Sequence, residues 1–216
     1  MRFPEWTGFQ EKKLWDWLDL LLVPLMLAAG IFVLESAESR RQEYNLAEQY
    51  KQQILRDYFN ELNAIVFDQQ KFDALKNSKI YAPERELLGS RTLAALEVLE
   101  GDEKRKSQII RFIGNSSLSP LIPIRRANLA NLDLSYVDLY KADMRRVSLA
   151  GTSLIGANLK GAYLCDADLS NADFTGANLD NAKYSNDTVI PEGIFSESQL
   201  QSMDRRIKEQ CEPALP

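Results

Sequence analysis

The sequence has 216 residues, of which 45% are hydrophobic and 26% are charged, and its formal net charge at neutral pH is -5. Charges of both signs are interspersed along the chain. This balance argues against a basic nucleic-acid-binding surface and against a strongly acidic substrate trap.

Several features also argue against an enzyme. The chain contains no histidine, which removes the usual general base and the commonest zinc ligand. It lacks a phosphate-binding loop and a dinucleotide-binding motif. We therefore expect no catalytic residues, no cofactor and no metal site. The two cysteines, Cys165 and Cys211, have no metal-ligand spacing and are interpreted as unpaired thiols in a reducing compartment.

An apolar segment near the N-terminus predicts a membrane anchor. Residues 20–34 read LLLVPLMLAAGIFVL, without a charge, and they form a transmembrane helix in a predicted first region of residues 1–35. Tryptophans on its N-terminal side favour the bilayer interface, and a proline within it predicts a kink. A cleaved signal peptide is the alternative, but the residues that follow make a poor cleavage site. The residues that define the anchor are Trp15, Trp17, Leu20, Pro24 and Leu34.

Three helices are predicted between the anchor and the repeats. Residues 36–64 lack Gly and Pro and predict an amphipathic stalk helix, whose apolar stripe either packs within the chain or forms a homodimer. Residues 65–121 predict a loop, to residue 82, and then a helical hairpin. The first hairpin helix spans Pro83–Leu99 and stops at Gly101, and Asp102 caps the second. The stalk stripe consists of Ala47, Tyr50, Ile54, Tyr58 and Leu62.

A five-residue repeat occupies residues 127–186. Its twelve units read ANLAN, LDLSY, VDLYK, ADMRR, VSLAG, TSLIG, ANLKG, AYLCD, ADLSN, ADFTG, ANLDN and AKYSN. A period of five fits neither an α-helix nor a simple strand, so it predicts stacked units that each bury little alone. The first and third positions point inward, one small and one large. Residues 122–126, IPIRR, keep the phase as a degenerate thirteenth unit.

These units resemble the pentapeptide-repeat family, whose signature is Ala, then Asp or Asn, then Leu, then two variable residues. ANLAN, ANLKG, ADLSN, ADFTG and ANLDN match it closely. The resemblance implies a right-handed quadrilateral β-helix with four units in each coil, and so three coils. We expect the first coils to be wider or irregular, because four units there lack Ala at position one: Leu132, Val137, Val147 and Thr152.

The predicted fold class is therefore α+β. A transmembrane helix, an amphipathic helix and a helical hairpin precede a right-handed quadrilateral β-helix, which occupies residues 122–194 with its cap. Residues 195–216 form a C-terminal capping helix, from Ser196 to about Gln210, and a tail. Both ends of a solenoid expose unpaired strand edges, and the helical parts are suitable covers.

The whole arrangement also resembles a cyanobacterial subtype of this family. In that subtype a tryptophan-rich membrane segment precedes a charged helix, a segment similar to RTLAALEVLEGDEKRKSQIIRFI, and the repeats. The resemblance implies a single-pass protein of the plasma or thylakoid membrane, and we expect the repeats on the cytoplasmic side. The expected function is a noncatalytic scaffold or accessory subunit that docks on a larger, photosynthetic, membrane complex.

Two other functions are considered. One is a DNA mimic that binds a topoisomerase, but the repeat has a net charge of only -2 and three coils are short for such mimicry. The other is a homo-oligomeric membrane protein without a fixed partner. No nucleic-acid partner is expected.

A basic patch on the first coil is the candidate partner-binding surface. Residues twenty apart stack in such a coil, so Arg125 lies on Arg145 and Arg126 on Arg146. Clustered arginines bind carboxylates and phosphates, which favours an acidic partner or anionic headgroups. The alternative is a solvated face in which Arg146 pairs with Asp166. The candidate residues are Arg125, Arg126, Tyr140, Lys141, Arg145 and Arg146.

Overall fold

The computed structural model describes residues 14–77, 82–190 and 193–205. The chain divides into two compact units, residues 1–50 and residues 51–216. The long helix α1 (Leu14–Val66) contributes to both units and runs without a break through the predicted anchor and stalk, with Pro24 inside it.

The predicted transmembrane span is not confirmed. Among the described residues, no helix is long and apolar enough to cross a bilayer. The uncharged run from Leu20 to Leu34 is shorter than the roughly 20 residues that a span requires. The side chains of Trp15, Trp17 and Leu20 lie outside what the structure describes.

The C-terminal part of α1 packs on α3 (Ala82–Val98). Tyr58 and Leu62 are buried, and the Tyr58 hydroxyl lies 2.7 Å from Oγ1 of Thr92 on α3. Burial of this phenol raises the pKa of Tyr58. The stalk stripe therefore packs within the chain at Ile54, Tyr58 and Leu62. Ala47 and Tyr50 are exposed, and a homodimer through them stays a prediction.

The predicted loop between residues 65 and 82 is wrong for its central part, which is helix α2 (Gln69–Asn77). Asp68 begins this helix, because its carboxylate accepts hydrogen bonds from the backbone N–H groups of Gln70 and Lys71. Phe72 and Leu75, three residues apart, pack against the core. These two apolar side chains are enough to fold a polar segment against α1 and α3.

Helix α4 (Glu103–Asn115) begins as predicted, with Asp102 as its N-cap. The Asp102 side chain accepts a hydrogen bond of 3.0 Å from the backbone N–H of Arg105. Ahead of it, Gly101 has a φ of +77°, which suits the predicted stop after α3. Ile109, Ile110 and Ile113 of α4 are fully buried.

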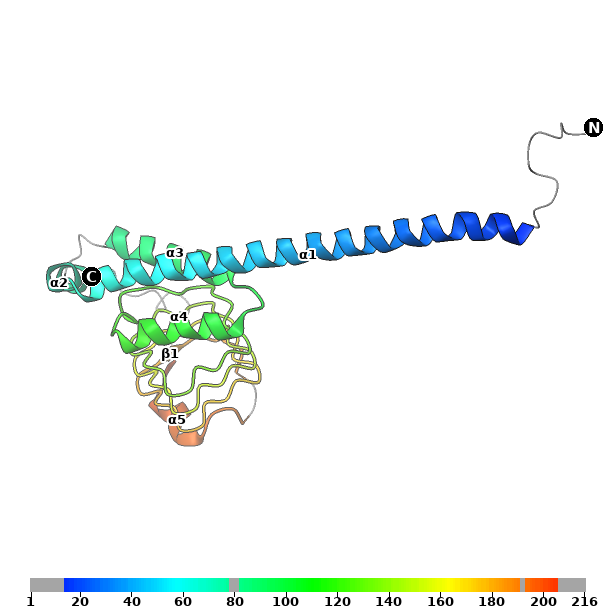
Figure 1. Ribbon diagram of the computed structural model, residues 1–216. Helices are drawn as coiled ribbons and strands as arrows, with labels where there is room; N and C mark the ends of the chain where they lie inside the picture. Colours follow the sequence, from blue (N-terminus) through cyan, green and yellow to red (C-terminus); the bar gives the residue numbers. More distant parts are fainter. Residues whose placement is uncertain (1–13, 78–81, 191–192, 206–216) are drawn as a thin grey trace, which may run out of the picture. The chain divides into compact units, whose positions relative to one another are not determined.

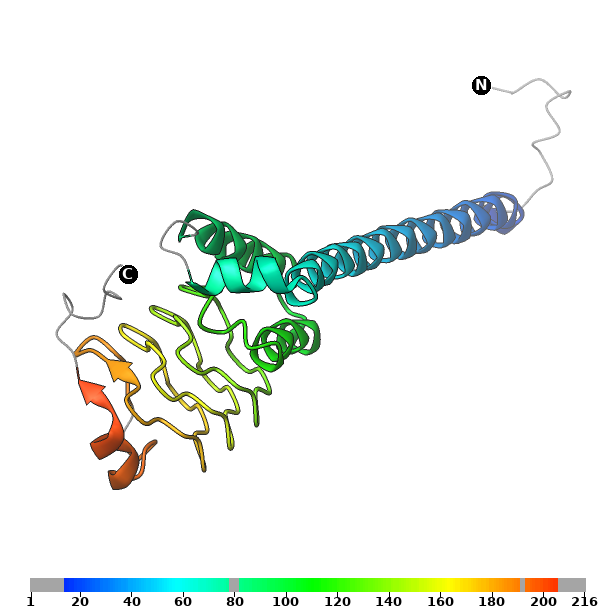
Figure 2. The same ribbon diagram turned by 90° about the vertical axis from the view of Figure 1, so that its left-hand side faces the viewer.

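The repeats form a stack of coils in which each unit pairs with the unit twenty residues later (Figure 2). Parallel bridges join Asn128 to Ser148 and Ser148 to Asp168, and the other three walls repeat the pattern. Position three is buried in every unit except the last, where Tyr184 is partly buried, and position five turns each corner from Asn131 to Asn181 with a positive φ. The predicted inward positions are confirmed.

We expected the first coils to be irregular, but the irregularity in register lies at the end of the stack. The first coils keep the twenty-residue step, although bulky residues replace Ala there. Thr152 fits because its hydroxyl donates a hydrogen bond to the carbonyl of Leu129. In the last coil Asp168 pairs with Val189, one residue later than the repeat requires.

Helix α4 and the turn that follows it cover the first edge of the stack (Figure 1). Arg111 donates to the carbonyls of Ser135 and Asp133, at 2.8 and 2.9 Å, and Ser119 donates to the carbonyl of Asp138 at 2.7 Å. In the later coils these wall carbonyls accept backbone N–H groups of the preceding coil. The first coil has α4 in place of a preceding coil, so its edge carbonyls are satisfied by side chains.

A short cap covers the last edge. Helix α5 (Glu197–Ser202) begins at Ser196 with a capping box, and Gln199 donates to the carbonyls of Phe174 and Ala177 at 3.1 Å. Strand β2 (Asp204–Arg205) then pairs in parallel with β1 (Lys183–Tyr184). The prediction of one helix from Ser196 to about Gln210 is therefore wrong, because the chain leaves the helix to extend the ladder.

Candidate interaction surface

The outer walls of the stack are the candidate surface, because helices cover both of its edges. Residues at positions two, four and five line the outside of the walls, except for the buried side chains of Cys165 and Ser185, while positions one and three fill the interior. The packed interior leaves the walls as the part of the repeats that a partner can reach.

The predicted stacking of the arginines is confirmed. The backbone N–H of Ile124 donates to the carbonyl of Asp143, and that of Arg126 donates to the carbonyl of Arg145. Residues 122–126 are therefore in phase with the repeat and lie one coil before residues 142–146.

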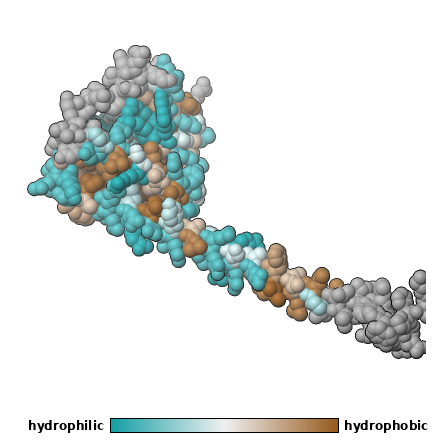
Figure 3. Space-filling view, turned by 90° about the horizontal axis from the view of Figure 1, so that it is seen from above, coloured by the Kyte–Doolittle hydropathy of each residue, from teal (hydrophilic) through white to brown (hydrophobic). Residues whose placement is uncertain are grey.

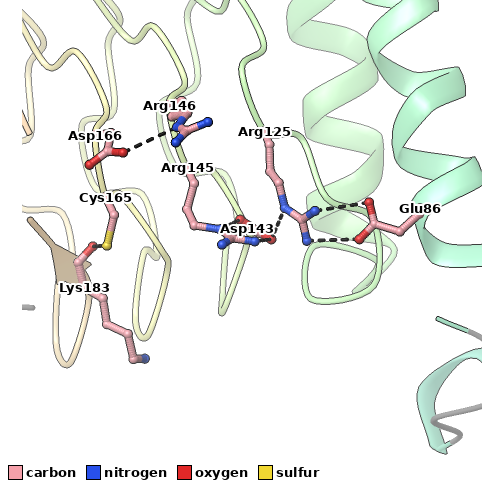
Figure 4. A network of polar contacts seen from close by, with 8 residues as sticks. All are labelled: Glu86, Arg125, Asp143, Arg145, Arg146, Cys165, Asp166 and Lys183. Carbon is pink, nitrogen blue, oxygen red and sulfur yellow. Dashed lines mark hydrogen bonds and ion pairs between the residues drawn. The ribbon is translucent and has the colours of Figure 1, made fainter. Parts of the chain in front are cut away.

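Two of these arginines share one carboxylate (Figure 4). Asp143 accepts from Nε of Arg125 at 2.5 Å, and from Nε of Arg145 at 2.8 Å. Burial raises the pKa of Asp143, but the hydrogen bonds and charges of Arg145 and Arg125 outweigh burial and lower it. Arg125 also pairs with Glu86 of α3 at 3.0 Å, so it joins the helical part to the first coil.

The remaining two arginines lie at the next corner. Nε of Arg146 lies 3.4 Å from Oδ2 of Asp166, which is the pairing expected of a solvated face. Arg126 has a φ of +61° and is exposed. Three of the four arginines thus have carboxylates of this chain as partners, and their charge is largely compensated before any partner arrives.

Tyr140 and Lys141 lie at the opposite corner of the same wall. The ammonium of Lys141 is 5.1 Å from the ring centroid of Tyr140, within the range of a cation–π interaction. The backbone N–H of Lys141 donates to the carbonyl of Lys160 in the next coil at 2.9 Å. Both lysines are exposed, and neither has a carboxylate partner among the described residues.

Three residues of this surface were not predicted from the sequence. Glu86 lies in α3, and no periodicity in the sequence predicts that α3 contacts the solenoid. Asp143 could have been found, because it is the second residue of the unit that holds Arg145. Tyr136, at 78% exposure, could also have been found from its place at a corner position.

The interpretation of Cys165 as an unpaired thiol is wrong. This residue is disulfide-bonded, and its side chain is buried in the wall. Its Sγ lies 3.8 Å from the carbonyl oxygen of Lys183, in the next coil (Figure 4). Cys211 lies outside the described residues. Disulfides persist in oxidising compartments, so the cysteine no longer supports a reducing one.

Comparison with known families identifies the repeats. A family model described as pentapeptide repeats matches residues 124–151 and 148–183, with eight copies. The chain belongs to the pentapeptide-repeat family. The match covers the walls that carry Arg125, Tyr140 and Lys141, and the predicted resemblance of the repeats is confirmed. The cyanobacterial subtype is not confirmed and stays a prediction.

Two solved structures of pentapeptide-repeat proteins are similar to this chain. Rfr23 from the cyanobacterium Cyanothece 51142 has 30% identity over 38% of this chain and 55% of its own, with a TM-score of 0.30. The protein alr5209 from Nostoc Pcc 7120 has 30% identity over 37% of this chain and 77% of its own, with a TM-score of 0.23. This chain thus spans 55% of the length of Rfr23. No curated protein matches it.

Proposed function

We propose that this pentapeptide-repeat protein is a noncatalytic scaffold that docks a partner protein on the outer walls of its solenoid and attaches to a membrane through α1. The proposal of a scaffold rests on one observation: helices cover both edges of the stack. Arg111 donates to carbonyls of the first edge and Gln199 to carbonyls of the last, so these edges are closed to strand addition and the outer walls are left for docking. Side chains on such walls are held in fixed columns, which lowers the entropic cost of docking.

Attachment to a membrane is supported by the apolar part of α1. Seven large apolar residues there are each more than half exposed: Leu25, Met26, Leu27, Ile31, Phe32, Val33 and Leu34. Because a helix turns 100° for each residue, they point to every side of α1 rather than along one stripe. Figure 3 shows hydrophobic residues on this part of the helix and hydrophilic residues further along it. A partner protein would cover one face of this helix, whereas lipid surrounds a helix on all faces.

The proposed setting is a larger membrane complex of a plasma or thylakoid membrane. The disulfide bond of Cys165 favours an oxidising compartment for the repeats over the cytoplasmic side.

A matched pair of substitutions tests the attachment. Leu27 and Leu46 are both leucines of α1 with 62% and 65% exposure. In flotation with phospholipid vesicles we expect the wild-type chain and the Leu46→Glu variant to float, and the Leu27→Glu variant to stay in the dense fraction. A wild-type chain that does not float contradicts the attachment.

The scaffold is tested separately, by the native size of the chain after gentle detergent extraction from its own membranes. We expect a complex larger than the chain and its detergent. A chain that is monomeric and free of partners contradicts the scaffold, whatever the result of flotation.

A further inference from the structure

We propose that the docking site of the scaffold is a tyrosine–lysine corner, formed by Tyr140, Lys141 and Lys160, together with Tyr136 at the other end of the same wall, and that this site binds an acidic segment of a partner protein that also carries apolar side chains. The inference rests on the proposed scaffold function and gives it a site and a class of partner. It moves the site away from the arginines, whose charges are largely compensated within the chain.

The ring of Tyr136 is exposed but held in place. It is 78% exposed, and it occupies the space over Gly156, one coil further on. A Cβ atom added to Gly156 would lie 2.6 Å from Cε1 of the ring. The ring therefore lies against the wall at a point where only glycine leaves room. Exposed aromatic side chains held in one position are typical of the residues that carry most of the binding energy at interfaces.

Lys141 is held in a similar way. A Cβ atom added to Gly161 would lie 3.2 Å from its Cγ, so its aliphatic stem also lies over a glycine of the second coil. Its ammonium reaches the Tyr140 ring, at 5.1 Å from the centroid. Lys160 follows Tyr140 in the next coil of the same column. The corner thus places two cations around the Tyr140 ring, and Tyr136 adds a second ring at the other end of the wall.

Charge selects the class of partner. The carboxylates nearest to the corner along the chain are Asp143, which is paired with Arg125 and Arg145, and Asp138. Oδ1 of Asp138 accepts from the backbone N–H of Tyr140 at 3.0 Å and from Nδ2 of Asn158 at 2.8 Å. Asp138 is therefore engaged by neutral donors, and neither lysine is paired with either carboxylate. Asp180 follows Lys160 in the third coil, so the positive region ends there. Two unpaired lysines favour carboxylates, and the tyrosine rings favour apolar groups between them.

The two glycines of one column provide a matched experiment. Gly156 and Gly176 have φ values of +64° and +68°, so alanine strains the backbone similarly at both. Only at Gly156 does the new methyl collide with Tyr136, since nothing lies within 4 Å of the corresponding position at Gly176. Gly156→Ala therefore displaces the ring without removing it.

The probe is a twelve-residue peptide of Glu and Leu, and its binding to the full-length chain is measured by fluorescence anisotropy. We expect Tyr136→Ala and Gly156→Ala each to raise its Kd about tenfold, as for an interface hot spot, and Gly176→Ala to leave it unchanged. Lys141→Gln together with Lys160→Gln should weaken binding and flatten its dependence on salt. A peptide with Lys in place of Glu should not bind.

Four results would overturn the inference while leaving the scaffold function intact. The acidic peptide does not bind at millimolar concentration, or it binds Tyr136→Ala as tightly as wild type. Alternatively, binding is lost in Arg126→Gln and kept in the corner variants, which places the site at the arginines. Binding of the corner to phosphatidylserine vesicles in place of the peptide would equally contradict it, because the partner would be a lipid.

Discussion

Arg125 and Asp143, which lie in consecutive coils, are joined by a contact of 2.5 Å between Nε and Oδ2. Arg125 also holds Glu86 of α3, and Asp143 also holds Arg145. The arginines predicted to bind a partner thus join the helical part of the second unit to its solenoid. Replacing all of them at once would remove both partners of a half-buried carboxylate, so such a variant reports on folding as well as on docking.

Asp143→Asn should destabilise the second unit by about 1–3 kcal/mol at neutral pH, because it removes the charge on which two arginines converge. The sign of the pH dependence follows from the lowered pKa of Asp143. The carboxylate stabilises the fold fully above its unfolded-state pKa of about 4, and this contribution is lost as the pH falls through the lower folded-state value. Urea unfolding at pH 7 and pH 3 should show the difference between variant and wild type shrinking in acid. A difference that is equal at both pH values would contradict this.

Arg111→Met should lower the free energy of unfolding by about 1–3 kcal/mol, since the carbonyls of Ser135 and Asp133 lose their donor. Lys104→Met is the control, because Lys104 is an exposed residue of the same helix. Chemical denaturation followed by circular dichroism measures both. Equal effects of the two substitutions would show that the edge carbonyls need no side-chain donor.

Gly89→Ala should destabilise the protein, although alanine is the better helix former. A Cβ atom at Gly89 would lie 2.6 Å from the carbonyl oxygen of Pro123, so α3 would have to move away from the solenoid. Gly30, also helical, has nothing within 4 Å of its Cβ position, and Gly30→Ala should be neutral or slightly stabilising. Thermal unfolding compares the two, and a rise in Tm for Gly89→Ala would rule out the close contact.

Cys165 should resist alkylation in the unfolded, unreduced chain, because its sulfur is in a disulfide bond. Iodoacetamide in guanidinium, followed by peptide mass spectrometry, should leave it unmodified until a reductant is added. Guanidinium removes the protection that burial alone provides. Modification of Cys165 without reductant would mean that the thiol is free.

The repeat could be read from the sequence because its period alone fixes which residues stack. The column from Arg126 to Arg146 follows from counting in twenties, and the pairing of Arg146 with Asp166 follows from the next step. Positions one and three face inward for the same reason, since four walls leave no other place for a Leu that recurs every five residues.

Contacts between elements of different kinds could not be read in this way. The pairing of Glu86 with Arg125 depends on where α3 lies on the first coil, and the bonds of Arg111 depend on where α4 lies. Helix α2 was missed because its two apolar residues are few among charges. The register shift at Val189 was missed because it follows the last regular unit.

Only part of the proposed docking surface was predicted from the sequence. Tyr140 and Lys141 were included for their nearness to the arginines, whereas the role of Tyr136 depends on Gly156, a residue of the next coil that has no side chain. A column in which a large residue precedes a glycine is a signal that could be sought in other repeats of this kind.

The most direct test measures crosslinking to partner proteins. A photo-crosslinking amino acid replaces Tyr136 or Ala150 in the full-length chain, in its native membranes. Ala150 lies on another wall of the solenoid and serves as the control. We expect one discrete crosslinked protein from position 136 and none from position 150. Crosslinks of equal yield from both positions, or from neither, would contradict a docking surface at the tyrosine–lysine corner.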